Sequence, residues 1–260
     1  MALSEASAPT PFDDGELYGI LLGGFDYGLD FYLDLARRAG GPVLDVGCGT
    51  GRVMLPCLQA GVDIDGLDLF EPMLAQMREP AARLGLSPRL YRADMSDFRL
   101  PRRYALVMIP FNAFTHNVTQ ESQIRCLECC REQLLPGGAL VFDGAFPGLH
   151  WIGGQEGCRV LEGEKTDPRT GRTLRVFDTR SFDRVRQIQH SINEVESIGP
   201  DGTAELLHRS EFDTRWVYKD EMALLLRHTG YARWEIHGDF DGRALTQETD
   251  GMVVHAWAAS

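Results

Sequence analysis

The chain has 260 residues, and its formal charge is −12 because 38 Asp and Glu residues outnumber 26 Lys and Arg residues. Hydrophobic residues make up 43% of the chain and charged residues 25%, which is typical of a folded globular protein rather than a disordered one. An acidic surface repels phosphate groups, so no nucleic-acid partner is expected. No apolar run approaches the ~20 residues that cross a bilayer, so no membrane partner is expected.

The N-terminal residues and the cysteines predict a cytoplasmic location. Residues 1–14 contain neither the basic nor the apolar segment of a secretory signal, and we expect them to form a loose leader. Six cysteines in a chain of this size do not suggest a disulfide framework, so free thiols are expected. Cys126, Cys129 and Cys130 share a helix face, but no second cysteine pair completes a zinc site. We therefore predict no metal and expect small buried side chains.

The first part of the chain predicts alternating strands and helices. Apolar and polar residues at helical spacing over 17–38 indicate one or two short helices, with a joint at Gly23 and Gly24. From residue 42 onward, short apolar runs alternate with helical patterns, which is typical of a doubly wound parallel sheet. Strands are expected at 43–46, 63–68, 89–93, 104–110 and 139–143, and helices at 51–60, 71–84 and 120–135.

After residue 146 the pattern changes to long antiparallel strands separated by turn residues. A helix over 220–229 follows them, with Asp220 as its expected N-cap. Two final strands are expected to return to the parallel sheet, which makes the antiparallel segment an insertion. The three long strands are expected at 173–182, 185–196 and 204–217, and the two final strands at 233–238 and 252–258.

A glycine-rich segment, Asp45-Val46-Gly47-Cys48-Gly49-Thr50-Gly51, follows the first expected strand. Such a turn lets a ligand approach the backbone beside a helix N-terminus. Asp68 ends the second expected strand, about 20 residues further on, and can accept hydrogen bonds from ribose hydroxyls. A dinucleotide fingerprint needs a third small residue where this chain has Arg52, so a nicotinamide-dependent dehydrogenase is disfavoured.

An acidic residue followed by G-x-G-x-G resembles the first motif of class I S-adenosylmethionine-dependent methyltransferases. Three further segments match that superfamily in order: 66–74, Ala93-Asp94-Met95 and Leu135-Pro136-Gly137-Gly138. The resemblance covers residues 18–146. It implies S-adenosylmethionine as the cofactor and a doubly wound seven-stranded Rossmann-like sheet, with an inserted antiparallel β platform and an N-terminal helical lid.

The resemblance also implies cofactor contacts at particular positions. It places Asp68 on the ribose and Asp94 at the adenine amino group. Leu69 and Met73 would pack against the adenine ring. The full set of expected cofactor residues is Asp45, Gly47, Cys48, Gly49, Asp68, Leu69, Met73, Asp94, Met95, Pro110 and Tyr27.

Within the superfamily, the chain is similar to small-molecule methyltransferases such as the amino-sugar N,N-dimethyltransferases and glycine N-methyltransferase. Pro110-Phe111-Asn112 differs from the signature of nucleic-acid amino methyltransferases, which again disfavours a nucleic-acid substrate. The expected organisation is a helical lid at 1–40, an S-adenosylmethionine-binding core at 41–146, an antiparallel insertion at 147–218, and the last helix and strands at 219–260.

Two residues are candidates for catalysis. His116, in the loop after the fourth expected strand, can titrate near neutral pH and act as a base, or it can pack against the following helix. Tyr18, like Tyr27, can cover the methionine end of the cofactor or the acceptor, or it can pack within its own segment. A hydroxyl acceptor would need a base, whereas an amine acceptor would not.

Five residues are candidates for binding the acceptor. Phe111 and Asn112 follow the fourth expected strand, where ligands of such sheets bind. Phe146 and Trp151 follow the fifth and would form aromatic walls or only support the insertion. Arg215, near the end of the third inserted strand, is the candidate for binding an anionic group of the acceptor.

The sequence therefore predicts methyl transfer from S-adenosylmethionine to a small-molecule acceptor, with an amine nitrogen favoured by the resemblance. The alternatives are a small-molecule O-methyltransferase and a non-catalytic S-adenosylmethionine-binding protein. Both a monomer and a homodimer are compatible with the sequence.

Overall fold

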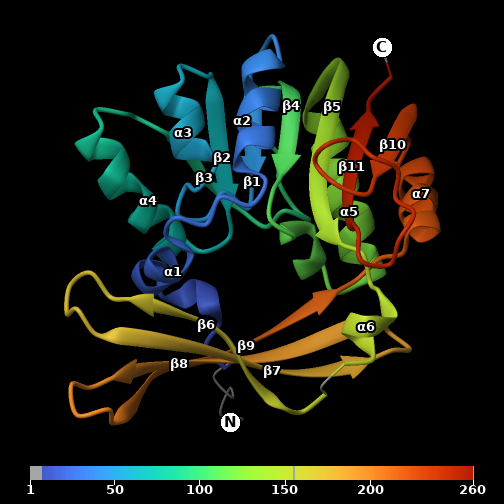
Figure 1. Cartoon of the computed structure of the whole chain (residues 1–260). Coiled ribbons are helices and arrows are strands. Elements are labelled where there is room, and N and C mark those ends of the chain that lie inside the picture. Colours follow the sequence, from blue (N-terminus) through green and yellow to red (C-terminus); the bar gives the residue numbers. More distant parts are fainter. Residues whose placement is uncertain (1–7, 155, 260) are drawn as a thin grey trace, which may run out of the picture.

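The computed structural model describes residues 8–154 and 156–259. Figure 1 shows a seven-stranded sheet with helices on both faces, and below it a four-stranded antiparallel sheet, here called the platform. The seven strands lie in the order β10-β11-β5-β4-β1-β2-β3. The predicted fold class, a doubly wound sheet with an inserted antiparallel platform, is confirmed.

Strand β1 (Val43–Val46) lies inside the core sheet. It pairs in parallel with β2 (Ile64–Asp68) on one side and with β4 (Tyr104–Ile109) on the other. Every residue of β1 and β2 is buried, as expected for parallel strands covered on both faces. The sheet continues through β3 (Arg89–Arg92) beside β2 and through β5 (Leu134–Ala145) beside β4.

The last two strands, β10 (Arg233–His237) and β11 (Gly251–Trp257), complete the core sheet beside β5. They rejoin the sheet as the sequence predicted, and β11 departs from its otherwise parallel arrangement. This strand runs antiparallel to both β5 and β10. A loop without a helix joins β10 to β11, and such a connection favours an antiparallel pair.

Helices cover the two faces of the core sheet with separate hydrophobic clusters. Helices α2 (Leu29–Arg38), α3 (Met54–Gln59) and α4 (Glu71–Arg83) pack on one face, and α5 (Gln120–Gln133) and α7 (Lys219–His228) pack on the other. Among the described helices, none has the length and apolar character that a membrane span requires.

The start of α7 corrects one prediction. Its N-cap is Tyr218, so Asp220 is not the N-cap and instead lies in the first helical turn together with Glu221. Carboxylates in the first turn interact favourably with the helix dipole, so these acidic residues stabilise the helix start without capping it.

The predicted loose leader is wrong for its described part, and residues 1–7 lie outside the described residues. A 3-10 helix, η1 (Pro11–Asp13), forms within it. The Pro9 carbonyl oxygen also accepts a hydrogen bond from the Glu211 N–H of the platform at 2.8 Å. This segment therefore connects the platform to the N-terminal helices.

Helix α1 (Gly15–Leu22) lies close against α4. A Cβ atom on Gly15 would come within 2.5 Å of the Pro72 carbonyl oxygen, so only glycine allows this approach. The chain then breaks before α2 at Gly23 and Gly24, and Gly24 has a φ of 74°. Of the predicted one or two short helices with a glycine joint, the structure has two.

The platform has four strands, so the expected number of three is wrong. They are β6 (Arg159–Thr166), β7 (Thr173–Asp183), β8 (Ile188–Ile198) and β9 (Ala204–Arg215), preceded by the short helix α6 (Leu149–Ile152). Strand β6 is an edge strand whose residues are nearly all exposed. Charged edge strands lack the alternating apolar pattern that reveals a strand in sequence.

Arg215 fixes the platform to the core. Its side chain is 9% exposed and donates hydrogen bonds to Gln123 of α5 at 2.6 Å and to Glu221 of α7 at 2.8 Å. A buried guanidinium shared between two helices restrains how the end of β9 sits against the core.

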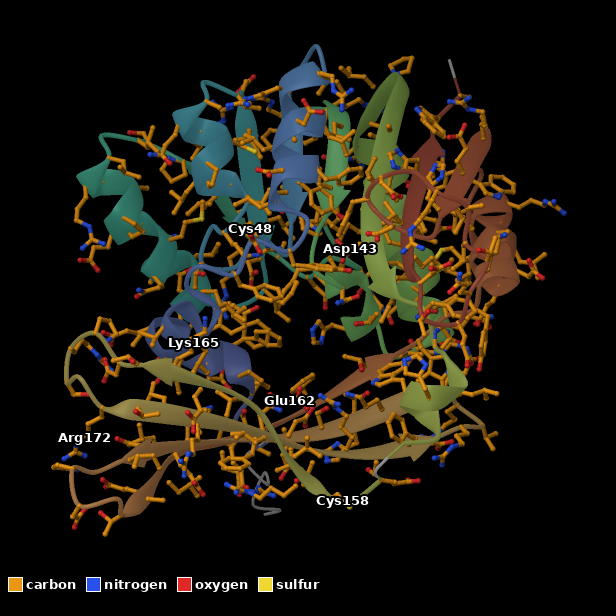
Figure 2. The ribbon with its side chains drawn as sticks, in the orientation of Figure 1. Cys48, Asp143, Cys158, Glu162, Lys165 and Arg172 are labelled. Atoms are coloured by element: carbon orange, nitrogen blue, oxygen red, sulfur yellow. The ribbon has the colours of Figure 1, made fainter. Side chains whose placement is uncertain are left out.

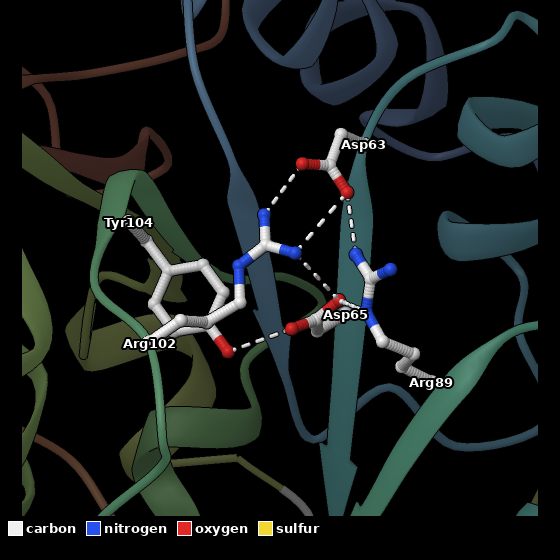
Figure 3. Close-up of polar contacts among 5 residues, drawn as sticks. All are labelled: Asp63, Asp65, Arg89, Arg102 and Tyr104. Carbon is white, nitrogen blue, oxygen red and sulfur yellow. Dashed lines mark hydrogen bonds and ion pairs between the residues drawn. The ribbon is translucent and has the colours of Figure 1, made fainter.

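A second polar cluster stabilises the amino end of β2, at the end of the strand opposite Asp68 (Figure 3). The buried Asp65 carboxylate accepts hydrogen bonds from the Tyr104 hydroxyl at 2.9 Å and from Arg89 Nε at 2.6 Å. Burial and this carboxylate raise the pKa of Tyr104. The remaining members, Asp63 and Arg102, pair with each other at 2.6 Å.

Replacement of Tyr104 tests whether this cluster serves stability alone. Tyr104→Phe leaves the ring in place and removes one donor to a buried carboxylate, so the free energy of unfolding is expected to fall by about 1.5–3 kcal/mol. Denaturant unfolding measures this loss. The folded variant should bind S-adenosylmethionine, the expected cofactor, as tightly as the unchanged protein. A weaker affinity would contradict the separation of this cluster from the opposite end of the sheet.

Candidate active site

The chain turns sharply between β1 and α3 through three glycines with positive φ. Gly47, Gly49 and Gly51 have φ angles of 73°, 55° and 89°. A Cβ atom on Gly51 would lie 2.8 Å from Met77 Cγ, and one on Gly49 would lie 3.3 Å from the Met73 methyl group. The loop therefore packs against α4 behind it, and glycine keeps its other side open to a ligand.

Asp68 ties the end of β2 to this loop. Its carboxylate accepts hydrogen bonds from the Gly49 N–H and from the Phe70 N–H, each at 2.9 Å. Burial raises the pKa of Asp68 despite these two donors. A carboxylate accepts about four hydrogen bonds, so the same group has lone pairs left for a diol.

Asp45, at the end of β1, is buried without a partner. The residue is 1% exposed, and neither carboxylate oxygen has a hydrogen-bond partner among the described residues. Burial raises the pKa of Asp45 to about 7, with Arg52 lowering it and Asp68 raising it further. An uncompensated buried carboxylate costs stability, so this position suits a cationic ligand group.

The other expected adenine contacts lie around the same loop. Leu69 is exposed, whereas Met73 is buried with its methyl group against Gly49. Asp94 accepts hydrogen bonds from the Ser96 N–H at 2.7 Å and hydroxyl at 2.8 Å, which orders the turn after β3. The sulfur of Met95 accepts a bond from Asn117 at 3.1 Å, and its methyl group points toward Gly47.

The loop after β4 is held in an unusual conformation by Asp143 of β5. Phe111 and Asn112 both have positive φ, at 61° and 57°, although neither is glycine. The Asp143 carboxylate accepts hydrogen bonds from their two N–H groups at 2.8 and 3.0 Å, and from the Tyr32 hydroxyl at 2.5 Å. The expected site residues Pro110, Phe111 and Asn112 are thus positioned by a residue of the neighbouring strand.

Tyr27 lies between this loop and the C-terminal strands. Its ring centroid is 6.2 Å from that of Phe111 and 5.0 Å from that of Phe240. Arg52 donates to the Tyr27 carbonyl at 2.8 Å and lies 4.8 Å above the Phe111 ring. The residue that breaks the dinucleotide fingerprint therefore holds the joint between α1 and α2 over the site.

Tyr18 and His116 belong to an aromatic group formed by three separate parts of the chain. The ring of Phe12 lies 5.8 Å from Tyr18 and 5.1 Å from His116. Phe212 of the platform lies 5.8 Å from His116. Burial raises the pKa of Tyr18 to about 12 and lowers that of His116 to about 4. Both side chains are therefore neutral near pH 7.

A cleft of about 700 Å³ lies between the core and the platform. Tyr27, Phe146 and Trp151 line it, together with Asp178 of β7. Figure 2 shows the labelled Asp143 and Cys48 on the side of the core that faces the platform, where the carboxyl ends of the parallel strands lie. Three of the expected site residues, Tyr27, Phe146 and Trp151, thus line the same cleft.

Arg215, the expected anion-binding residue, does not line the cleft. Its guanidinium is bound by Gln123, Gln187 and Glu221, and it is not among the described residues that line the cleft. Its contacts connect the platform to the core, so the structure offers it no free position for an anion of the acceptor.

The sequence reasoning missed the residues that hold the site together. Asp143 and Tyr32 were not singled out, although an acidic residue at the end of a buried strand was a usable signal. Phe12 and Phe212 gave no signal, because they meet His116 only after the platform folds against the core.

Comparison with known proteins now identifies the class. Residues 43–138 match the family model described as a methyltransferase domain. The cypemycin N-terminal methyltransferase of a Streptomyces species is 27% identical over 215 residues, covering 83% of this chain and 82% of that one. The dTDP-3-amino-3,4,6-trideoxy-alpha-D-glucopyranose N,N-dimethyltransferase of Streptomyces venezuelae is 35% identical over 103 residues, 39% of this chain and 41% of that one.

A solved structure extends the likeness to nearly the whole chain. The structure of CalS10 with S-adenosylmethionine bound, an amino pentose methyltransferase from Micromonospora echinaspora, has a TM-score of 0.68 at 21% identity. It covers 94% of this chain and 96% of that one, which shows the shared fold. The chain is a methyltransferase of this fold. S-adenosylmethionine, the donor that the sequence motifs predicted, is the cofactor bound in the CalS10 structure.

The residues present fit this cofactor. The three positive-φ glycines leave the backbone open, and Asp68 has free lone pairs for the ribose. Asp45 offers an unpartnered buried carboxylate for the ammonium group of the methionine part. We propose these contacts as the cofactor site, with Leu69, Asp94 and Met95 around the adenine.

The proposed role of Asp45 predicts an unusual dependence of stability on pH. With a folded-state pKa of about 7 against 3.8 ordinarily, the folded chain keeps a proton between pH 4 and 7 that the unfolded chain has lost. The free energy of unfolding should therefore fall as pH rises through this window, by at most about 1.4 kcal/mol per pH unit.

Asp45→Asn removes this contribution and should flatten the decline when unfolding is measured from pH 4 to 8. The same variant should bind S-adenosylhomocysteine roughly tenfold or more weakly at pH 8, because the ammonium group loses its charged partner. Unchanged affinity at pH 8 would show that the ammonium group lies elsewhere.

Proposed function

We propose that the chain transfers a methyl group from S-adenosylmethionine to an amine nitrogen of a small-molecule acceptor bound in the cleft between core and platform. This proposal rests on the lining of the cleft, which combines aromatic rings with carboxylates. When bound, the cofactor supplies a methyl group on a positively charged sulfur. Aromatic and anionic walls favour an acceptor that becomes a cation as it is methylated.

The reaction needs orientation more than acid–base chemistry. The lone pair of the nitrogen attacks the methyl carbon in line with the carbon–sulfur bond, whose electron pair stays on sulfur. The nitrogen then releases a proton to water. Holding the two reactants in this geometry supplies most of the acceleration, because the methyl group is already activated.

The surroundings of His116, the candidate base, disfavour a hydroxyl acceptor. His116 lies among the rings of Phe12 and Phe212, and its burial lowers its pKa to about 4. A general base works best when its pKa lies near the operating pH. Tyr18, with a pKa raised to about 12, is protonated and equally unsuited to accept a proton. We infer that neither residue acts as a general base and that both pack within the aromatic group around Phe12.

The names of the relatives support nitrogen as the methylated atom. Those named above are an N-terminal methyltransferase and an amino-sugar N,N-dimethyltransferase. The cleft volume of about 700 Å³ lies within the range of small-molecule sites.

The direct test is methyl transfer to a panel of amines, amino sugars and phenols. Release of S-adenosylhomocysteine and the mass of each product are measured after incubation with S-adenosylmethionine. The proposal expects N-methylated amines. Transfer only to phenols would support the O-methyltransferase alternative, and cofactor binding without transfer to any acceptor would support a non-catalytic protein.

The role of His116 is tested by its replacement. His116→Asn keeps a polar side chain and should lower the rate by less than about tenfold, because no general base is lost, whereas such a base contributes 10²–10⁴-fold. The rate between pH 6 and 9 should keep the same profile in both proteins. A larger loss together with the disappearance of an inflection from the profile would make His116 the base.

A further inference from the structure

The platform wall of the cleft contains a carboxylate with an unused oxygen. Asp178 of β7 is 6% exposed and lines the cleft. Its Oδ2 accepts a hydrogen bond from Arg180 Nε at 2.7 Å, whereas its Oδ1 has no partner among the described residues. A buried carboxylate oxygen without a donor lowers stability unless a ligand supplies one.

A second unused acceptor lies on the same face of the platform. Gln189 of β8 pairs with Phe182, which lines the cleft, and side chains opposite each other in an antiparallel pair share a face. Its Nε2 donates to Ser191 at 2.8 Å, and within the described part of the chain its Oε1 has no hydrogen-bond partner. Ser191 in turn contacts Asp178 Oδ2 at 3.4 Å. Asp178 Oδ1 and Gln189 Oε1 are thus two hydrogen-bond acceptors linked through Ser191.

The charges around the cleft disfavour an anionic ligand. Its described lining residues include four carboxylates, two arginines and one histidine, and no lysine. Arg180 pairs with Asp178 and with Glu162 at 2.7 Å each. Arg243 pairs with Asp250 at 2.6 Å and with Asp239 at 3.0 Å. Both guanidinium groups are thus neutralised, and a phosphate would meet excess negative charge.

Aromatic rings complete the surroundings of this wall. The rings of Trp151 and Phe182 lie 6.0 Å apart, and each is about as far from Trp216. Aromatic faces beside a carboxylate are the combination that binds organic cations. The platform wall therefore presents hydrogen-bond acceptors, negative charge and aromatic surface together.

We propose that Asp178 and Gln189 bind a second ammonium group of the acceptor, so that the substrate is an unphosphorylated diamine rather than a nucleotide-linked sugar. This inference rests on the proposed amine N-methyltransferase function and narrows its substrate class. One amine is methylated at the cofactor, and the other is held at the platform wall. The chain would differ in this respect from the relative whose name specifies a dTDP sugar.

The test measures binding, so it is independent of methyl transfer. Calorimetry compares putrescine, butylamine and thymidine diphosphate on the full chain saturated with S-adenosylhomocysteine. Putrescine should bind roughly tenfold or more tightly than butylamine, and thymidine diphosphate should not bind. Absence of putrescine binding, or binding of thymidine diphosphate, would overturn the proposal.

Variants locate the binding site. Asp178→Asn keeps the shape and removes the charge, so it should weaken putrescine roughly tenfold and leave butylamine unchanged. Glu164→Gln is the matched control, since Glu164 is exposed on β6 and pairs with Arg175. It should change neither affinity. Equal effects of the two variants would mean a diffuse charge effect and would contradict a specific site.

If Asp178→Asn fails to bind S-adenosylhomocysteine, it is judged not to fold, and Gln189→Met serves as the second variant. It removes the free Oε1 acceptor and should weaken putrescine about threefold or more. If it leaves putrescine unchanged, the inference fails. Methyl transfer to amines with unchanged putrescine binding in these variants would retain the proposed function and reject only the diamine assignment.

Discussion

The Asp143 carboxylate is the interaction on which the rest of the active site depends. It accepts three hydrogen bonds, from Tyr32 and from the N–H groups of Phe111 and Asn112. Positive φ at two consecutive non-glycine residues costs about 1–3 kcal/mol each, and these bonds offset that cost. One side chain thereby joins helix α2, the loop after β4 and strand β5. Burial raises the pKa of Asp143, so its three donors are what keep a charge acceptable there.

Buried carboxylates recur wherever a positively charged ligand group is proposed. Asp45 is unpartnered beside the glycine loop, and Asp178 has one unpartnered oxygen on the platform wall. Neither position favours the stability of the free chain, because burying charge without a donor is costly. Both become favourable when a cofactor or acceptor supplies an ammonium group. Burial of these carboxylates therefore lowers the stability of the free protein and makes the site complementary to cations.

Local motifs explain what could be predicted from the sequence. The glycine loop and Asp68 depend on residues close in sequence and on a regular strand–turn–helix unit, so their places followed from spacing. Asp143 could not be assigned in this way, since its partners are 31 to 111 residues away. The same holds for the platform. Strand β6 has no apolar alternation that would reveal it in the sequence. The hydrogen bonds of Arg215 to α5 and α7 are tertiary contacts, which spacing along the chain does not indicate.

The aromatic residues illustrate the same limit. Phe146 and Trp151 were expected near the acceptor because they follow a strand end, and they line the cleft. His116 was placed near the site by the same rule, whereas Tyr18 and Tyr27 were expected there because the resemblance implies an aromatic lid. The protonation of Tyr18 and His116 could not be predicted, because the apolar surroundings that shift the pKa of each come from Phe12 and the platform.

A crystal structure of the protein with S-adenosylhomocysteine tests the account most directly. The account predicts the ammonium group of the ligand at Asp45, its ribose at Asp68, and its sulfur facing the cleft beside Tyr27 and Phe111. A sulfur atom that points away from this cleft, toward a surface unconnected with the platform, would contradict the proposed geometry of methyl transfer.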